Sequence, residues 1–257
     1  YEISLGLVGS EMCIRDRYCE MKPHSLMQLK LQQKCPQPFQ NGEVMFRIYL
    51  PGILAMSIIV VSSNILVQFL YGNWLTYGAF TYPLAFLVTD IMNRVYGSAV
   101  ARRIVFVGFL IGVVCSMIGT QVMIELDKDF YAPAVTFRIA VASGSGFLLA
   151  QLLDIFIFTK LKDRSWWHAP FVSSVIGGAL DTSIFFAVSF SLIFVSLIGT
   201  DHNTDFMNQM VPILGVGEDA SLWISLAIAD YLVKLSLALL CLIPFRFLVA
   251  QLMVKKV

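Results

Sequence analysis

The sequence predicts an all-α membrane protein in which six transmembrane helices cross the bilayer and both termini face the cytoplasm. Hydrophobic residues make up 58% of the 257 residues and charged residues only 14%, which is outside the range of ordinary soluble domains. Six apolar segments reach the roughly 20 residues that a membrane-crossing helix needs. Lys and Arg concentrate on one side of these segments. With a net charge of +1, the chain offers no basic surface to nucleic acid, so we expect no nucleic-acid partner.

The N-terminal part is expected to lie outside the membrane domain. Residues 1–17 (YEISLGLVGSEMCIRDR) resemble the translated read-through of a sequencing adaptor, so we expect them to be non-native and Met21 or Met27 to be the start. Residues 18–46 contain three prolines among Gln and Lys, a composition typical of a tail without a stable fold. We expect this tail to be cytoplasmic.

The six-helix domain is expected to extend over residues 47–254. Its fifth and sixth spans exceed the minimum length and must therefore tilt, kink or extend into the headgroup region. Small residues four apart, such as Gly108, Gly112 and Ser116, indicate close helix packing, either within one subunit or in a homodimer. The predicted spans are about 49–71, 75–97, 104–124, 139–158, 171–198 and 222–249.

Charge placement predicts the orientation. Basic residues lie in the tail, in the connections after the second and fourth spans, and at the C-terminus, whereas the other connections are mainly acidic. Because cytoplasmic loops carry an excess of Lys and Arg, the basic side is expected to be the cytoplasmic one. The basic residues are Lys22, Lys30, Lys34, Arg47, Arg94, Arg102, Arg103, Lys160, Lys162, Arg164, Arg246, Lys255 and Lys256.

Six polar side chains inside the spans are the candidate substrate-binding or transport-pathway residues. A carboxylate in hydrocarbon is costly unless it meets a partner, a proton or water, so such residues usually mark a pathway or a site. Asp181 lies about 15 Å along its span, near the bilayer centre, and Lys234 is similarly central. The six residues are Asn64, Asp90, Asp154, Asp181, Asp230 and Lys234.

Neighbours along the helix suggest which of these charges are paired. Asp90 and Arg94 are four residues apart, and we favour an ion pair between them. Asp230 and Lys234 have the same spacing, which fits an ion pair and a functional role equally. Asp181 has no basic residue within one turn. A functional role is favoured for it, and the alternatives are capping another helix or pairing across helices, for example with Lys234.

Several kinds of chemistry are not indicated. The chain has no GxxxxGK[ST] loop, no HExxH and no CxxC, so we expect no cofactor, no metal site and no enzymatic activity. An intramembrane enzyme with paired aspartates stays open as an alternative, because two of the aspartates could meet in a water-filled site.

Several segments, in their shared order, resemble the queuosine precursor transporter family, also described as vitamin uptake transporters. The resemblance covers every predicted span. One departure is Arg94, which follows Asn93 where many members have an acidic residue. The matching segments are Ser62-Ser63-Asn64, YPLAFLVTD at 82–90, Tyr96-Gly97 with Ala101-Arg102-Arg103, Arg138-Ile139-Ala140, Gln151-Leu152-Leu153-Asp154, Trp166-Trp167-His168-Ala169-Pro170, Asp181-Thr182, and Asp230-Tyr231 with Lys234.

The resemblance implies import of 7-cyano-7-deazaguanine or 7-aminomethyl-7-deazaguanine across the bacterial inner membrane, for salvage into the tRNA nucleoside queuosine. A carboxylate could accept both the N1–H and the exocyclic amine of such a base. Asp181 is the first candidate for that role, followed by Asp154 and Asp90, while Asn64 could bind another edge. The principal alternative is the substrate-binding subunit of an energy-coupling-factor vitamin transporter.

Overall fold

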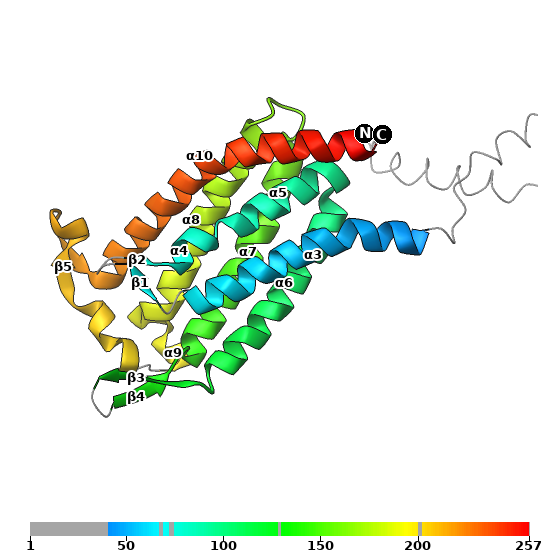
Figure 1. The fold of residues 1–257 in the computed structure, drawn as a ribbon. Coiled ribbons are helices and arrows are strands. Elements are labelled where there is room, and N and C mark those ends of the chain that lie inside the picture. Colours follow the sequence, from blue (N-terminus) through cyan, green and yellow to red (C-terminus); the bar gives the residue numbers. More distant parts are fainter. Residues whose placement is uncertain (1–40, 67–68, 72–74, 128–129, 200–201, 257) are drawn as a thin grey trace, which may run out of the picture. The chain divides into compact units, whose positions relative to one another are not determined.

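The computed structural model describes residues 41–66, 69–71, 75–127, 130–199 and 202–256, which are mostly helical (Figure 1). The chain divides into two compact units, Tyr1–Arg47 and Ile48–Val257. Of the first unit only the start of one helix is described. The predicted adaptor segment 1–17 and the tail up to residue 40 lie outside the described residues, and their assignments stay predictions.

Five helices among the described residues are long and apolar enough to cross a membrane. Large apolar side chains on their outer faces, such as Leu110, Phe156 and Ile243, are exposed. Such extensive apolar exposure is unusual for a soluble monomer and typical of a surface that contacts lipid. The five helices are α3 (Asn41–Leu66), α6 (Ser98–Gly119), α7 (Phe137–Leu161), α8 (His168–Phe190) and α10 (Leu222–Lys256).

The predicted second span, 75–97, is not one continuous helix. It consists of β2 (Leu75–Thr76), α4 (Gly78–Thr81) and α5 (Leu84–Tyr96). Pro83 has no N–H for the helical hydrogen bond, which accounts for the break. The next N–H groups bond three residues back, Ala85 to Tyr82 and Phe86 to Pro83, as in a tight turn. Tyr82 therefore lies at an interruption in the middle of the predicted span.

The predicted fifth span, 171–198, extends beyond the end of the helix that forms there. α8 ends at Phe190, and a short 3₁₀ helix η1 (Leu192–Phe194) and α9 (Val195–Ile198) follow. Buried Arg138 of α7 donates to the carbonyl oxygens of Val188 (2.7 Å) and Ser191, so a charged side chain satisfies the end of α8. An apolar run in the sequence thus continued beyond the end of the helix itself.

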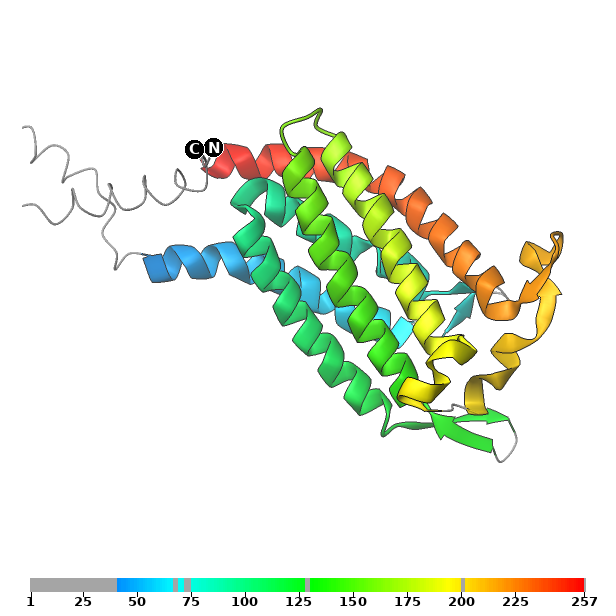
Figure 2. The same cartoon turned by 180° about the vertical axis from the view of Figure 1, so that it is seen from behind.

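Three antiparallel hairpins lie together at one end of the helices, opposite the α5–α6 and α7–α8 turns (Figures 1 and 2). The predicted third span, 104–124, runs into one of them, because α6 ends at Gly119 and residue 123 begins a strand. The strands are β1 (Leu70–Tyr71) with β2, β3 (Met123–Asp127) with β4 (Phe130–Pro133), and β5 (Met210–Pro212) with β6 (Asp219–Ser221); η2 (His202–Asn208) and η3 (Ile213–Gly215) adjoin the last.

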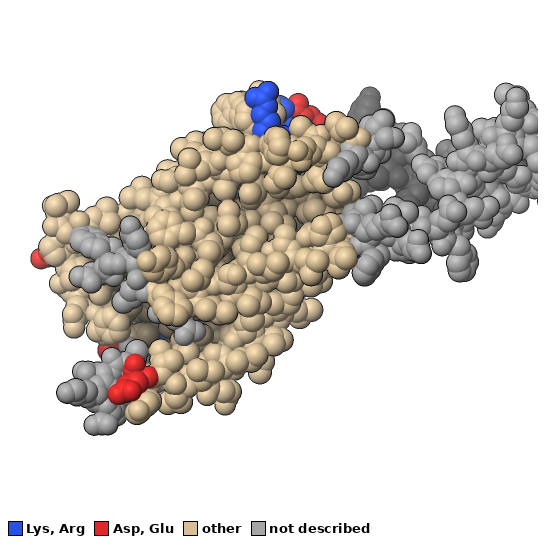
Figure 3. All heavy atoms as spheres, viewed as in Figure 1, with Lys and Arg blue, Asp and Glu red and all other residues tan. Residues whose placement is uncertain are grey.

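The two ends also differ in charge. Lys and Arg gather at the α7–α8 connection with acidic side chains beside them, only acidic side chains are seen at the opposite end near the β3–β4 hairpin, and a broad face without charged side chains lies between the two ends in this view (Figure 3). This separation fits a membrane crossing, since charged residues are costly in hydrocarbon.

The helices of the second unit pack in two layers, one of α6, α7 and α8 and one of α3, α4–α5 and α10 (Figures 1 and 2). The broken helix α4–α5 lies between the others, and α5 packs against α6, α7, α8 and α10. Gly97 turns the chain directly from α5 into α6 with φ of +93°, a value that favours glycine. The largest apolar core cluster includes Met56, Ile104 and Phe147. The polar side chains of Thr89, Asp90 and Asn93 on α5 are buried.

Candidate functional site

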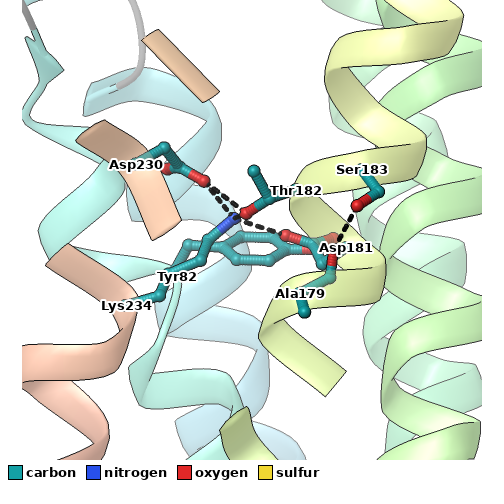
Figure 4. A network of polar contacts seen from close by, with 7 residues as sticks. All are labelled: Tyr82, Ala179, Asp181, Thr182, Ser183, Asp230 and Lys234. Carbon is teal, nitrogen blue, oxygen red and sulfur yellow. Dashed lines mark hydrogen bonds and ion pairs between the residues drawn. The ribbon is translucent and has the colours of Figure 1, made fainter. Parts of the chain in front are cut away.

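A buried network centres on the ammonium group of Lys234 (Figure 4). The Nζ atom donates to Asp181 Oδ2 at 2.7 Å and Thr182 Oγ1 at 2.9 Å, and lies 2.5 Å from Asp230 Oδ2. The Thr182 hydroxyl donates to Asp230 at 2.7 Å, and the Tyr82 hydroxyl donates to Asp181 Oδ1 at 3.1 Å. All three donors of the ammonium are used.

Local sequence positions each group of this network. Asp230 and Lys234 are one turn apart on α10, whereas Asp181 and Thr182 are adjacent on α8. The break before α5 places Tyr82 against both helices, with the ammonium 5.5 Å from its ring centre. Gly146 lets α7 approach, because a Cβ there would lie 3.1 Å from Asp181 Oδ1. Four segments that are distant in sequence thus converge on one point.

Burial gives this network its electrostatic character. The side chain of Lys234 is 8% exposed, that of Asp181 6% and that of Asp230 13%. Two carboxyl groups share one ammonium in an apolar bundle, where a buried charge needs hydrogen-bonded partners. The network therefore offers both acceptors and a strong donor to a polar ligand that exchanges with the internal contacts.

A pocket of about 380 Å³, including its open mouth, adjoins the network. Its lining includes Pro83, Asp90, Ser174, Gly178, Lys234 and Phe245. A second pocket of about 330 Å³ lies between α3, α6 and α7 and is lined by Asn64, Tyr82, Ser116 and Ala140, among others.

Asp90 and Asp154 form a separate acidic pair. Asp90 accepts hydrogen bonds from the hydroxyl groups of Ser173 and Ser174, each at 3.3 Å, and its carboxyl group faces that of Asp154. The expected ion pair between Asp90 and Arg94 is wrong. Arg94 instead donates to the carbonyl oxygen of Lys162 and lies over the Phe158 ring, because the helix end offers a carbonyl acceptor within its reach.

Asn64 lies apart from both groups. Its amide nitrogen donates to the carbonyl oxygen of Val60 in its own helix at 2.8 Å. It shares the second pocket with Tyr82, which is its nearest link to the Lys234 network. Its predicted role in substrate binding stays a prediction.

The structure therefore groups the six predicted residues as Asp181, Asp230 and Lys234 in one network, Asp90 and Asp154 in a pair, and Asn64 alone. Sequence reasoning missed Tyr82 and Thr182 as members of the network. Pro83 in the middle of an apolar span was the available signal for a special position at Tyr82. Over the described residues, no group of three or more His, Cys, Asp or Glu side chains is placed to hold a metal ion.

Comparisons with known proteins point in one direction. A family model described as "Putative vitamin uptake transporter" matches residues 76–249. The "Queuosine precursor transporter" of Escherichia coli K12 is 28% identical over 209 residues, covering 77% of this chain and 85% of that protein. A "Probable queuosine precursor transporter" from Haemophilus influenzae is 28% identical (70% and 71% covered), and one from Bacillus subtilis 27% identical (69% and 72%). No solved structure matches. With its apolar helices, the chain is a multi-pass membrane protein similar to transporters.

Proposed function

Because the chain belongs to the family described as "Putative vitamin uptake transporter", we propose that it imports a 7-deazaguanine precursor of queuosine across the bacterial inner membrane. The substrate is 7-cyano-7-deazaguanine, 7-aminomethyl-7-deazaguanine or both. The names of three relatives, which cover most of the chain, support this substrate class. The resemblance expected from the sequence motifs is confirmed at the level of the family.

The broken helix provides the sixth crossing in this proposal. The 19 residues from Gly78 to Tyr96 would extend about 28 Å as a helix, close to the thickness of the hydrocarbon core. An even number of crossings puts both termini on one side. The basic α7–α8 connection then faces the cytoplasm, and the hairpin end with its acidic residues faces outward.

The Lys234 network has the chemistry that a guanine-like base needs. Such a base presents an N1–H and an exocyclic amine side by side, which a single carboxylate can accept together. Asp181 supplies that carboxylate when the base replaces the Tyr82 hydroxyl and the ammonium as its partners. The freed ammonium of Lys234 then donates to the carbonyl oxygen of the base.

The two pockets lie on opposite sides of this network, which fits alternating access. The first is lined by Pro170 at the start of α8, at the α7–α8 end. The second is lined by Ser116 and Ala140, close to the hairpin end. Tyr82 lines the second pocket and bonds to Asp181, whose partner Lys234 lines the first. The observation that carries the proposal is this buried, charge-paired network between two pockets.

Uptake by living cells tests the proposal. A bacterium unable to synthesise queuosine, expressing this chain alone, is supplied with labelled 7-cyano-7-deazaguanine, and queuosine in its tRNA is measured. We expect restored queuosine, and its loss in Asp181→Ala at normal membrane levels. Asp219→Ala, at an exposed position on β6, is the matched control.

The outcomes separate the alternatives. Queuosine that returns only when an ATPase module is co-expressed would indicate the energy-coupling-factor alternative. Turnover of a peptide or lipid by the purified protein would indicate an intramembrane aspartyl enzyme. Unchanged uptake by Asp181→Ala would remove that carboxylate from the site.

A further inference from the structure

The acidic pair of Asp90 and Asp154 is more deeply buried than the Lys234 network. Asp90 of α5 is 2% exposed and Asp154 of α7 is 0% exposed. The Asp154 side chain packs beside Gly177 of α8, where a Cβ would lie 3.4 Å from the Asp154 Cβ. Three helices therefore enclose two carboxyl groups that face one another.

The hydrogen bonding of this pair is incomplete. The oxygens of Asp90 accept from Ser173 and Ser174, but neither oxygen of Asp154 has a hydrogen-bond partner among the described residues. An ionised carboxylate is an acceptor only, so two facing carboxylates cannot satisfy each other. A proton on either one turns it into a donor to the other and removes one of two like charges from an apolar site. One shared proton satisfies this arrangement.

No cation compensates the pair within the described part of the chain. Neither carboxyl group forms a salt bridge, and Arg94, one turn along α5, points to the carbonyl oxygen of Lys162. From α10, Lys234 and Cys241 line the pocket that Asp90 also lines, but the ammonium is held by Asp181 and Asp230. From α8, Asp181 lies two turns further along and His168 lies at the first turn, stacked on Trp167.

The pair is linked to the Lys234 network along one face of α8. Ser173-Ser174, Gly177-Gly178 and Asp181-Thr182 repeat every four residues, so each step advances about 6 Å along the same face. The first pocket runs beside this face and is lined by Asp90, Ser174, Gly178 and Lys234. The pair and the Lys234 network therefore lie along one face of α8 and beside one pocket.

We propose that Asp90 and Asp154 together bind one proton, and that each transport cycle carries this proton across the membrane with one substrate molecule. The inference rests on the proposed function. A proton enters from water on one side, resides on one carboxyl oxygen with a hydrogen bond to the other, and leaves to water on the opposite side. No covalent bond of the substrate changes. With a neutral base such as 7-cyano-7-deazaguanine, each cycle moves one positive charge.

Proteoliposomes containing the purified full chain test this inference with labelled 7-cyano-7-deazaguanine. Counterflow, in which unlabelled base inside draws in labelled base, needs no ion gradient and reports transport itself. Accumulation is then measured with the outside one pH unit more acidic and the membrane potential held at zero. One coupled proton predicts accumulation of up to about tenfold, because one pH unit is a tenfold ratio of proton concentrations. A pH-sensitive dye in the vesicles should report acidification on addition of the base.

Two variants locate the proton. Asp154→Asn and Asp90→Asn each keep the shape of one member of the pair but remove its ability to take up and release a proton. We expect both to lose gradient-driven accumulation and vesicle acidification, and Asp154→Asn, which lines neither pocket, to retain counterflow. Asp219→Asn, at an exposed position, should behave like the unmodified protein.

Each other outcome overturns a defined claim. Counterflow by the unmodified protein without pH-driven accumulation would reject proton coupling and leave the proposed function standing. Accumulation driven by a sodium gradient at equal pH would reject the proton as the coupled ion. Full coupling in both asparagine variants would reject this pair as the site. Absence of counterflow in the unmodified protein would reject the proposed function itself.

Discussion

The four aspartates within the helices form two pairs with opposite surroundings. Asp181 and Asp230 share the ammonium of Lys234, with Thr182 and Tyr82 as further hydrogen-bond donors. Asp90 and Asp154 meet only each other and two serine hydroxyl groups. A carboxyl group inside a membrane domain can thus be stabilised either by an opposite charge or by a proton. The neighbours across the helix interface decide which.

Removal of the ammonium would make the first pair resemble the second. Lys234→Met leaves Asp181 and Asp230 buried without a cation, and breaking a buried ion pair typically costs about 3–5 kcal/mol. We expect the free energy of unfolding to fall by this amount, as measured by chemical or thermal unfolding in detergent, and uptake to be lost. Asp181→Asn, which retains the Lys234–Asp230 pair, should cost less, about 1.5–3 kcal/mol. Equal stability of Lys234→Met and the unmodified protein would contradict a charge-paired network.

Two adjacent glycines of α8 differ in how tightly they are packed: Gly177 lies beside the acidic pair and Gly178 beside the Lys234 network. A Cβ on Gly177 would lie 2.9 Å from Phe86 and 3.3 Å from the carbonyl oxygen of Ala150, next to Asp154. Gly177→Ala should therefore destabilise the protein by about 1–3 kcal/mol, because overpacking displaces α8. A Cβ on Gly178 would meet Lys234 at an ordinary 3.8 Å. Gly178→Ala should leave the thermal midpoint unchanged or raise it, since alanine favours helix. The reverse order would show that the acidic pair is the more loosely packed region.

The hydroxyl group of Tyr82, a neutral donor from the broken helix, should affect transport less than the charged groups do. Tyr82→Phe removes the 3.1 Å hydrogen bond to Asp181 but keeps the ring and its edge contact with Phe147. A hydrogen bond to a charged group is worth about 1.5 kcal/mol. Because the base must displace this bond to reach Asp181, we expect about a tenfold rise in uptake rate at low substrate concentration. Tyr131→Phe, on the exposed β4 strand, is the control. A rate unchanged by Tyr82→Phe would place the hydroxyl outside the site.

Arg94 should matter least, although sequence spacing paired it with Asp90. Since its guanidinium group bonds to the carbonyl oxygen of Lys162, Arg94→Gln should cost less than about 1 kcal/mol and leave pH-driven accumulation unchanged. Both quantities are measured on the same purified variant. Loss of pH-driven accumulation in Arg94→Gln would reveal an electrostatic effect of this cation on the acidic pair and blur the distinction between the two regions.

Sequence reasoning succeeded where the information is local. The apolar run 139–158 lies within α7 (Phe137–Leu161), whose first turn is capped by Thr136. The pairing of Asp230 with Lys234 follows from their spacing of four residues on α10. The resemblance to a transporter family also rested on short ordered motifs, and the family match confirms it.

Sequence reasoning failed where the rotation and packing of helices decide which side chains meet. Asp181 and Lys234 are 53 residues apart, and their contact was only one of several alternatives. Asp90 and Asp154 face one another because of how α5 and α7 are rotated, which composition does not specify. The interruption at Tyr82 depended on Pro83 alone, within a segment whose hydropathy resembles that of a continuous helix.

The threefold engagement of the Lys234 ammonium has a consequence for selectivity. Any molecule that enters must offer this nitrogen and its carboxylate partners replacements for the bonds they give up. A site that is built to form hydrogen bonds rejects analogues lacking the matching groups far more strongly than it rejects a change of size. Flat aromatic hydrocarbons, however well they fit the cavity, should be excluded, and heterocycles should be sorted by the order of donors and acceptors along one edge.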